Sequence, residues 1–294
     1  MTVLEVIQRS TDFLAKKGVE SARLQTELLL AEVLKLPRMQ LYLNFERALT
    51  AAETEAFREF IRRRGRREPL QHIVGSTSFC GYEISVSPQV LVPRPETELL
   101  AEHGWKFLNQ LAATRTNGNE RPKSITVLDF GTGSGCLAIA LAAKCPFAEV
   151  HALDTSSEAV ALARQSAVRL GLAERIQFWE SDAFAALPEA TTFDLIVSNP
   201  PYIPRDEIES LQTEVREFDP RAALDGGADG LDFYRRLAAE AKPFLRQRAK
   251  MMLEFGDDQA NQISHIFERE KWIVEATHLD YDQKPRILIV RRAG

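Results

Sequence analysis

The chain has 294 residues, of which 45% are hydrophobic and 27% charged, and its formal net charge is −5. These values are typical of a soluble globular protein with room for two domains, and the negative charge offers no general attraction for nucleic acid. No apolar stretch approaches the length of a membrane span, and the first residues lack the pattern of a signal peptide, so we expect a cytoplasmic protein without membrane contact. The three cysteines lack a metal-ligand spacing, which predicts reduced thiols and no metal site.

Residues 1–68 are predicted to form a small helical bundle. Apolar residues recur at helical spacing, among them Phe13 in a first helix and Leu24 in a second. The segment holds no catalytic constellation, so we interpret it as a substrate-recognition domain. Its basic run, residues 62–67, is typical of a solvated helix end, and the alternative is a face on which a partner docks.

Residues 69–95 are predicted to form a β-hairpin linker. Residues 71–75 and 79–86 show β-type alternation interrupted by glycines. The prolines that follow fix the backbone, and Glu96 is expected to open a helix. Residues 117–122 are expected to form a polar surface loop.

Residues 96–294 are predicted to fold as a doubly wound parallel sheet of the α/β class. Strand-like runs alternate with helical stretches such as 158–170 and 233–244. The connection between the last two runs is too short for a crossover, so these two are expected to pair antiparallel at the sheet edge. The expected strands are residues 125–130, 150–154, 176–179, 195–198, 251–255, 272–277 and 287–290.

A glycine loop, residues 131–135, follows the first of these strands. Such glycines let the backbone approach a nucleoside closely at the carboxyl edge of a sheet. Asp154 ends the next strand, where a carboxylate can accept both ribose hydroxyls, and Asp182 follows a third strand and suits the adenine amino group. Because Cys136 stands where a dinucleotide fingerprint has its third glycine, the pattern predicts an adenosine-type cofactor without a pyrophosphate.

The run Asn199-Pro200-Pro201-Tyr202 follows a buried strand. Its prolines supply no backbone N–H and hold the chain extended, which leaves an amide side chain, carbonyls and an aromatic ring at the strand end. The Asn199 amide oxygen and the Pro200 carbonyl can accept two N–H bonds while Tyr202 packs against a flat face. The run therefore predicts a receptor for a planar group that carries N–H donors.

Together, the runs 129–135 and 199–202 resemble the motifs of S-adenosylmethionine-dependent methyltransferases that modify planar amino groups. Finer features are similar to one family, the peptide chain release factor glutamine methyltransferases (PrmC/HemK family), over nearly the whole chain. The sequences that carry this resemblance are Gly75, Phe79-Cys80-Gly81, Val90-Leu91-Val92-Pro93-Arg94-Pro95-Glu96-Thr97-Glu98, Ile203-Pro204, Asp225-Gly226-Gly227-Ala228-Asp229-Gly230-Leu231-Asp232 and Leu253-Glu254-Phe255-Gly256.

The resemblance implies a Rossmann-like class I methyltransferase domain behind the helical domain, and a monomeric cytoplasmic enzyme. The implied reaction methylates the side-chain amide nitrogen of the glutamine in the GGQ motif of class-1 release factors. It consumes S-adenosylmethionine and yields S-adenosylhomocysteine.

The resemblance also assigns site residues. The family often has an aromatic residue beside the adenine where this chain has Ala183, so either Phe184 substitutes for it or the adenine face is more open. The implied catalytic residues are Asn199, Pro200 and Tyr202. The implied cofactor-binding residues are Asp129, Gly131, Thr132, Gly133, Ser134, Gly135, Asp154, Asp182, Ala183, Phe184 and Asn199. The implied substrate-binding residues are Arg94, Glu96, Asn199, Pro200, Pro201 and Tyr202.

Three other functions remain as alternatives. An amino-group methyltransferase acting on adenine or guanine would use the same 199–202 run, although the acidic balance of the chain disfavours nucleic acid. A ribosomal-protein glutamine is a second possible substrate, but such enzymes would not normally carry the run 93–98. A non-catalytic adaptor would have no use for both a cofactor loop and a substrate loop.

Overall fold

The computed structural model describes residues 1–115, 125–188 and 190–293, so the predicted polar loop at 117–122 lies outside the described residues. The chain divides into two compact units. The first consists of residues 1–76 with residues 212–218, and the second holds the other described residues. No helix in the described ranges is long and apolar enough to cross a membrane.

The first unit is helical, as predicted. Two of its helices begin with a capping box, in which a threonine (Thr2 or Thr50) and a glutamate three residues later cap each other's backbone N–H. The core that these helices share includes the fully buried Leu14, Leu29 and Leu41. The helices are α1 (Val3–Lys16), α2 (Ala22–Leu34), α3 (Arg38–Leu43), α4 (Ala51–Gly65), α5 (Leu70–Val74) and α9 (Thr213–Phe218).

Three details of the first unit differ from expectation. Phe13 and Leu24, which belong to the apolar patterns of the first two helices, are 41% and 43% exposed. The basic run is largely paired rather than solvated: Arg64 and Arg67 both donate to Glu214 of α9, at 2.8 and 2.6 Å.

The prediction of a strand at residues 71–75 is wrong, because these residues lie in helix α5 and its C-terminal cap. Pro69 precedes the helix, and Gly75, with φ of +84°, ends it in the left-handed conformation. In a short apolar run, the spacing of the hydrophobic residues alone does not distinguish a helix from a strand. The hairpin itself is present as β1 (Ser76–Phe79) and β2 (Tyr82–Ser85).

The second unit is built on a seven-stranded sheet in the order β5-β4-β3-β6-β7-β9-β8. The first five of these strands are parallel, which confirms the doubly wound prediction, and β8 pairs antiparallel with β9, as expected. The last strand, β9, enters between β7 and β8. The strands are β3 (Ile125–Phe130), β4 (Ala148–Asp154), β5 (Ile176–Glu180), β6 (Phe193–Ser198), β7 (Leu245–Glu254), β8 (Trp272–Leu279) and β9 (Pro285–Arg292).

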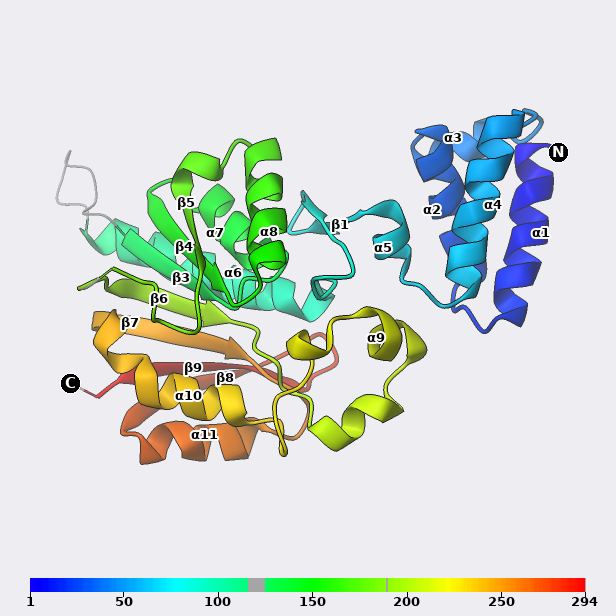
Figure 1. The fold of residues 1–294 in the computed structure, drawn as a ribbon. Helices are drawn as coiled ribbons and strands as arrows, with labels where there is room; N and C mark the ends of the chain where they lie inside the picture. The colour runs from blue at the N-terminus through cyan, green and yellow to red at the C-terminus, as the bar shows by residue number, and fades with distance from the viewer. Residues whose placement is uncertain (116–124, 189, 294) are drawn as a thin grey trace. The chain divides into compact units, whose positions relative to one another are not determined.

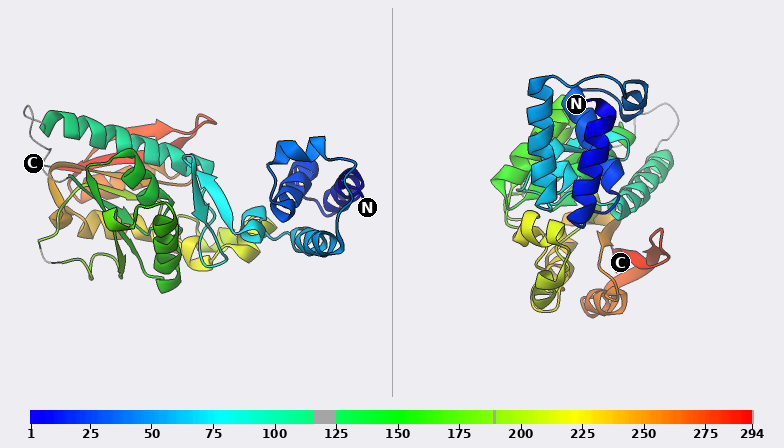
Figure 2. Two further views of the ribbon diagram at one scale, coloured as in Figure 1. Left: turned by 90° about the horizontal axis from the view of Figure 1, so that it is seen from above. Right: turned by 90° about the vertical axis from the view of Figure 1, so that its right-hand side faces the viewer.

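Helices cover both faces of this sheet (Figure 1). Alternate residues of β3 enter opposite cores: Val127 packs with α6, α7 and α8, whereas Leu128 packs with α10 and α11. The long helix α6 lies along the first of these faces (Figure 2). The helices are α6 (Pro95–Arg115), α7 (Cys136–Lys144), α8 (Ser157–Arg169), α10 (Asp232–Glu240) and α11 (Ala260–Arg269), with short 3₁₀ turns at 173–175, 205–210, 221–223 and 242–244.

Candidate active site

A cavity of about 460 Å³ lies at the carboxyl ends of β3, β4 and β6, within the second unit. Strand β3 has β4 on one side and β6 on the other, so the chain order reverses here. In doubly wound sheets such a switch point is where ligands bind, and the volume suits a small-molecule site.

The glycine loop forms one wall of the cavity. Gly131 and Gly133 have φ of +72° and +52°, and nothing lies within 4 Å of the position that a Cβ would take. A Cβ on Gly135 would instead lie 2.7 Å from Ala163 Cβ, so this glycine lets α8 pack against the start of α7. The loop therefore presents bare backbone to the cavity.

Asp129 lies beneath this loop and is fully buried. One carboxylate oxygen accepts hydrogen bonds from the Thr132 hydroxyl (2.6 Å) and the Ala138 N–H (3.0 Å), whereas the other has no partner among the described residues. Burial raises the pKa of Asp129 to about 7, against the effect of these two hydrogen bonds. A half-satisfied buried carboxylate under a glycine loop fits a cationic group of a ligand.

Asp154 lines the cavity at the end of β4. Its carboxylate accepts from the Gly133 N–H (2.8 Å) and the Ser156 N–H (3.0 Å), which fixes the side chain between the glycine loop and the start of α8. Each oxygen keeps a further lone pair for a ligand hydroxyl. The residues present thus fit the adenosine-type cofactor that the sequence predicts.

The segment after β5 reaches the cavity only in part. Asp182 and Ala183 line it, and the Asp182 carboxylate, 73% exposed, accepts from Arg236 at 2.6 Å. Phe184 is buried instead, stacked on Phe244 with ring centroids 4.3 Å apart. The structure therefore does not bring Phe184 to the cavity, which leaves the small Ala183 at this wall.

Asn199 and Pro200 line the cavity at the end of β6, opposite the glycine loop. The preceding Ser198 donates its hydroxyl to the Phe130 carbonyl at 2.7 Å, which ties the end of β6 to the end of β3. The Asn199 Nδ2 donates to Thr97 Oγ1 at 3.1 Å, so the amide oxygen is the atom left for a ligand. The predicted acceptor pair and the predicted cofactor loop share one cavity.

Tyr202 packs behind this cavity and does not line it. Its carbonyl accepts from Gln259 Nε2 at 2.8 Å, and its ring lies against Gly256, where a Cβ would be 2.9 Å from the ring. Burial, together with the nearby Glu254 charge, raises the pKa of Tyr202 to about 12, so the phenol stays neutral. The ring braces the 199–202 run in its extended conformation.

The glycines of the run 225–232 have a similar supporting role. A Cβ on Gly226 would lie 2.8 Å from the Pro201 carbonyl oxygen, and one on Gly230 would lie 2.3 Å from the Tyr202 carbonyl oxygen. Two backbone hydrogen bonds, from Ile203 to Leu224 and from Gly226 to Ile203, complete the contact. This contact holds the backbone that carries Asn199 and Pro200.

The run 93–98 contributes Pro93, Arg94 and Thr97 to the cavity, but not Glu96. Arg94 donates to Asp219 at 2.7 Å, and burial raises the pKa of Asp219 in spite of this partner. Glu96 is half-buried outside the cavity.

Of the predicted residues, Arg94, residues 131–134, Asp154, Asp182, Ala183 and residues 199–201 line the cavity, whereas Asp129 and Gly135 support it from below. The sequence interpretation missed other lining residues, among them residues 88–91, Pro220, Ala222, Ala223, Phe233 and Arg236. Only the family-like runs 90–98 and 225–232 pointed to these regions. No histidine lines the cavity within the described residues, and no cluster of three or more potential metal ligands occurs among them.

The sheet order, the glycine loop and the cavity at the switch point define a class I methyltransferase fold. Two solved structures share it. One is the 16S rRNA N2 G1207 methyltransferase RsmC of Thermus thermophilus, which is 22% identical with a TM-score of 0.51, and the match covers 74% of this chain and 50% of that chain. The other is a methyltransferase from Pyrococcus furiosus, which is 20% identical with a TM-score of 0.50, and the match covers 78% of this chain and 97% of that chain. Residues 108–217 match the methyltransferase small domain.

The chain belongs to the release factor glutamine methyltransferase family. Residues 5–75 match the PrmC N-terminal domain. Release factor glutamine methyltransferases of Geobacter sulfurreducens and Chlorobaculum tepidum are 44% and 43% identical to it, covering 91% and 90% of this chain and 89% of each relative. One from Rhodopirellula baltica is 40% identical over 86% of this chain and 83% of its own.

Proposed function

We propose that this protein methylates the side-chain amide nitrogen of the glutamine in the GGQ motif of class-1 peptide chain release factors, with S-adenosylmethionine as methyl donor. One observation carries the proposal: Asn199 and Pro200 line the same cavity as the glycine loop. The similar relatives named release factor glutamine methyltransferases support the choice of substrate.

The residues around the loop are assigned to the cofactor. The unpartnered oxygen of Asp129 suits its ammonium group, Asp154 its ribose hydroxyls, and Asp182 its adenine amino group. When bound, S-adenosylmethionine supplies an electrophilic methyl on a sulfonium, and the electron pair of the broken C–S bond stays on sulfur in S-adenosylhomocysteine.

Catalysis in this proposal is by orientation. An amide nitrogen is a poor nucleophile because its lone pair is delocalised, and no histidine in the described part of the cavity wall could serve as its base. Asn199 Oδ1 and the Pro200 carbonyl accept the two N–H bonds in the amide plane, so the lone pair, perpendicular to that plane, faces the methyl group. Such positioning supplies roughly 7–11 kcal/mol at best. The new N–C bond forms with the lone pair, and the surplus amide proton leaves to solvent.

The helical domain, residues 1–68 in the sequence prediction, is assigned to recognition of the release factor. The enzyme is expected to act as a monomer in the cytoplasm, where translation terminates. Sedimentation of the purified protein tests the monomer, and a dimeric mass would contradict it.

The experiment is a labelled methyl-transfer assay with a purified class-1 release factor, using wild-type factor and its GGQ Gln→Ala variant. Label on the wild-type factor alone supports the proposed substrate and target atom. Label on transfer RNA or DNA, with none on either factor, would overturn the substrate and leave an amino-group methyltransferase acting on nucleic acid.

A further inference from the structure

The backbone of the substrate run, residues 199–202, has few groups by which it can be held in place. Pro200 and Pro201 have no N–H, so neither can donate a hydrogen bond to a neighbouring segment. Only carbonyls remain, and in the proposed function the carbonyl of Pro200 binds the substrate. Within the described residues, the Tyr202 carbonyl is the first acceptor after Pro200 that a side chain binds. The attachment at this carbonyl therefore limits how far the Pro200 carbonyl can turn.

Gln259 makes this attachment. Its Nε2 donates to the Tyr202 carbonyl at 2.8 Å, and its Oε1 accepts from the Gly256 N–H at 3.0 Å. A carbonyl only accepts and an N–H only donates, so these two backbone partners fix the direction in which the side-chain amide points. Gln259 is 8% exposed and both ends of its amide are paired, so its side chain is a buried bridge between two backbone segments.

Two glycines make room for this bridge. A Cβ on Gly256 would lie 2.9 Å from the Tyr202 ring and 3.1 Å from Gln259 Oε1. A Cβ on Gly230 would lie 2.7 Å from Gln259 Nε2. All three distances are shorter than the 3.4 Å at which ordinary contact begins, so the amide cannot change its place without moving one of the backbones around it.

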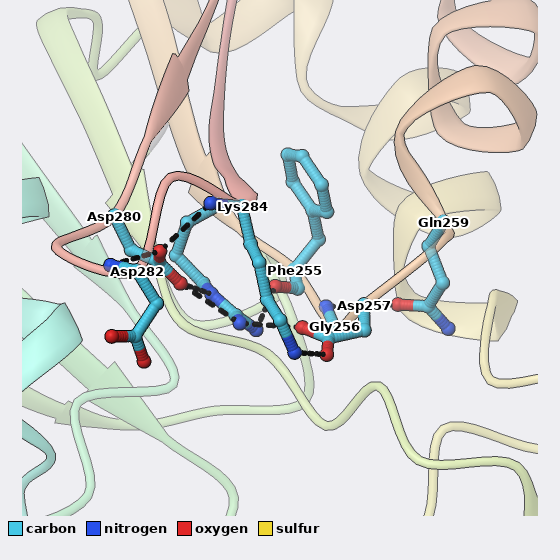
Figure 3. Close-up of polar contacts among 8 residues, drawn as sticks. Phe255, Gly256, Asp257, Gln259, Asp280, Asp282 and Lys284 are labelled. Atoms are coloured by element: carbon cyan, nitrogen blue, oxygen red, sulfur yellow. Dashed lines mark hydrogen bonds and ion pairs between the residues drawn. The ribbon is translucent and has the colours of Figure 1, made fainter.

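The segment that carries Gln259 is itself fixed from two sides. The Gln259 carbonyl accepts a backbone hydrogen bond in the first turn of α11. On the other side, Figure 3 shows Asp257 beside Lys284 of the β8–β9 turn, and the two form an ion pair. Arg286 donates to Asp257 at 2.6 Å and to the Phe255 carbonyl at 3.0 Å. Gln259 therefore reaches the substrate run from a backbone that is held independently of that run.

We infer that Gln259 is a positioning residue, which fastens the substrate run at the Tyr202 carbonyl and so holds the Pro200 carbonyl toward the methyl-accepting amide. The inference rests on the proposed function in one respect, that the Pro200 carbonyl accepts an N–H of the substrate. Gln259 does not line the cavity, so it acts through Tyr202 and not by contact with the cofactor or the substrate. It gives a function to the segment after β7, to which the sequence interpretation assigned none.

The first test compares the variants Gln259→Asn and Tyr234→Phe. Gln259→Asn keeps the amide but shortens the side chain by one methylene, so it cannot reach both backbone partners. Tyr234→Phe is the matched control, because the Tyr234 hydroxyl donates at 2.7 Å to the Glu254 carbonyl, a backbone acceptor of β7 outside the substrate run. At saturating S-adenosylmethionine we expect kcat to fall about 10- to 100-fold in Gln259→Asn and by less than about twofold in Tyr234→Phe. The affinity for S-adenosylhomocysteine should stay nearly unchanged in both, since neither side chain lines the cavity.

A second variant, Gln259→Met, keeps the length of the side chain without its polar groups. It should lose as much kcat as Gln259→Asn, and it replaces that variant if Gln259→Asn does not fold. A kcat that falls equally in the Gln259 variants and in Tyr234→Phe would overturn the inference, because the loss of any buried hydrogen bond to a backbone carbonyl would then explain the result. Wild-type kcat in Gln259→Met would overturn it as well.

Hydrogen exchange tests the fastening without turnover. The Ile203 N–H, bonded to the Leu224 carbonyl, and the Gly226 N–H, bonded to the Ile203 carbonyl, lie next to the substrate run and report its opening. After correction for global stability, both should exchange about tenfold or more faster in Gln259→Asn and at the wild-type rate in Tyr234→Phe. Wild-type exchange rates in Gln259→Asn would refute the fastening, whatever the substrate. If the wild-type enzyme fails to label the release factor while both amides respond as expected, only the proposed substrate fails.

Discussion

Replacing Gly230 by alanine should disable the enzyme by moving the backbone that carries Asn199. Gly230 has φ of +75°, and a Cβ there would lie 2.3 Å from the Tyr202 carbonyl oxygen. Ordinary contact begins near 3.4 Å, so one of the two backbones must shift by about 1 Å. The Gln259 side chain that binds the same carbonyl lies 2.7 Å from the new methyl and must also move.

Gly171 provides a matched control. It has φ of +70°, and nothing lies within 4 Å of its would-be Cβ. Alanine at either position costs about 1–2 kcal/mol for the left-handed backbone. Only Gly230→Ala adds a displacement near the substrate loop, and a misplacement of about 1 Å can lower turnover about 100-fold.

The assay is methyl transfer to the release factor at saturating S-adenosylmethionine, combined with urea unfolding and calorimetric titration of S-adenosylhomocysteine. We expect both variants to keep their cofactor affinity and Gly230→Ala to lose more stability than Gly171→Ala, because its Cβ also overlaps the Tyr202 backbone, while kcat falls about 100-fold in Gly230→Ala alone. If Gly230→Ala turns over as fast as Gly171→Ala, the 225–232 run does not position the substrate loop and the reasoning fails.

Three further perturbations test the site and the helical unit. Asn199→Ala should lower kcat about 100-fold and keep S-adenosylhomocysteine affinity, since orientation is lost and the cofactor contacts are not; equal loss of both in a folded variant would contradict its substrate role. Because burial raises the pKa of Asp129 to about 7, the affinity of the wild-type enzyme for S-adenosylhomocysteine should rise as pH increases through 7, when the carboxylate that we assign to the cofactor's ammonium ionises. The Asp129→Asn variant should bind S-adenosylhomocysteine about tenfold or more weakly, and its affinity should not depend on pH in this range. If calorimetry shows the same pH dependence for the variant as for the wild type, Asp129 does not bind the ammonium group. Burial raises the pKa of Glu27, but the hydrogen bonds from Arg23, Tyr42 and Arg38 outweigh it, so the folded-state pKa is lowered. The stability that Glu27 contributes is therefore present above its unfolded pKa near 4.5 and is lost as pH falls through the folded value. In urea titrations, Glu27→Gln should lower the free energy of unfolding by about 1–3 kcal/mol at neutral pH and by less in acid. The control is Glu55→Gln, which should change this free energy little because Glu55 is an exposed partner of Arg58. If the loss of stability in Glu27→Gln is as large in acid as at neutral pH, the charge of Glu27 is not its cause.

Local pattern was sufficient for most of the elements and for the cavity residues that lie at the strand ends. The strands that end at Phe130 and Ser198 are mostly apolar, and the glycines after the first and the prolines after the second stop each strand wherever it is placed in space. Since parallel strands end at one sheet edge, the residues after them were expected to meet, and they do. The resemblance left two possibilities, Phe184 beside the adenine or a more open adenine face, and the strand pattern could not choose between them; in the structure Phe184 is buried and stacks on Phe244.

The sequence by itself determined the class of fold, the glycine loop and the position of Asn199 and Pro200 at a strand end, because each depends on residues that are neighbours in the chain. Tertiary structure alone decided the contacts between distant segments. It placed β9 between β7 and β8, and it set Thr97 of α6 against the Asn199 amide. Periodicity reports which face of an element is buried, but not which partner is buried against it, and the orientation of one amide depends on that partner.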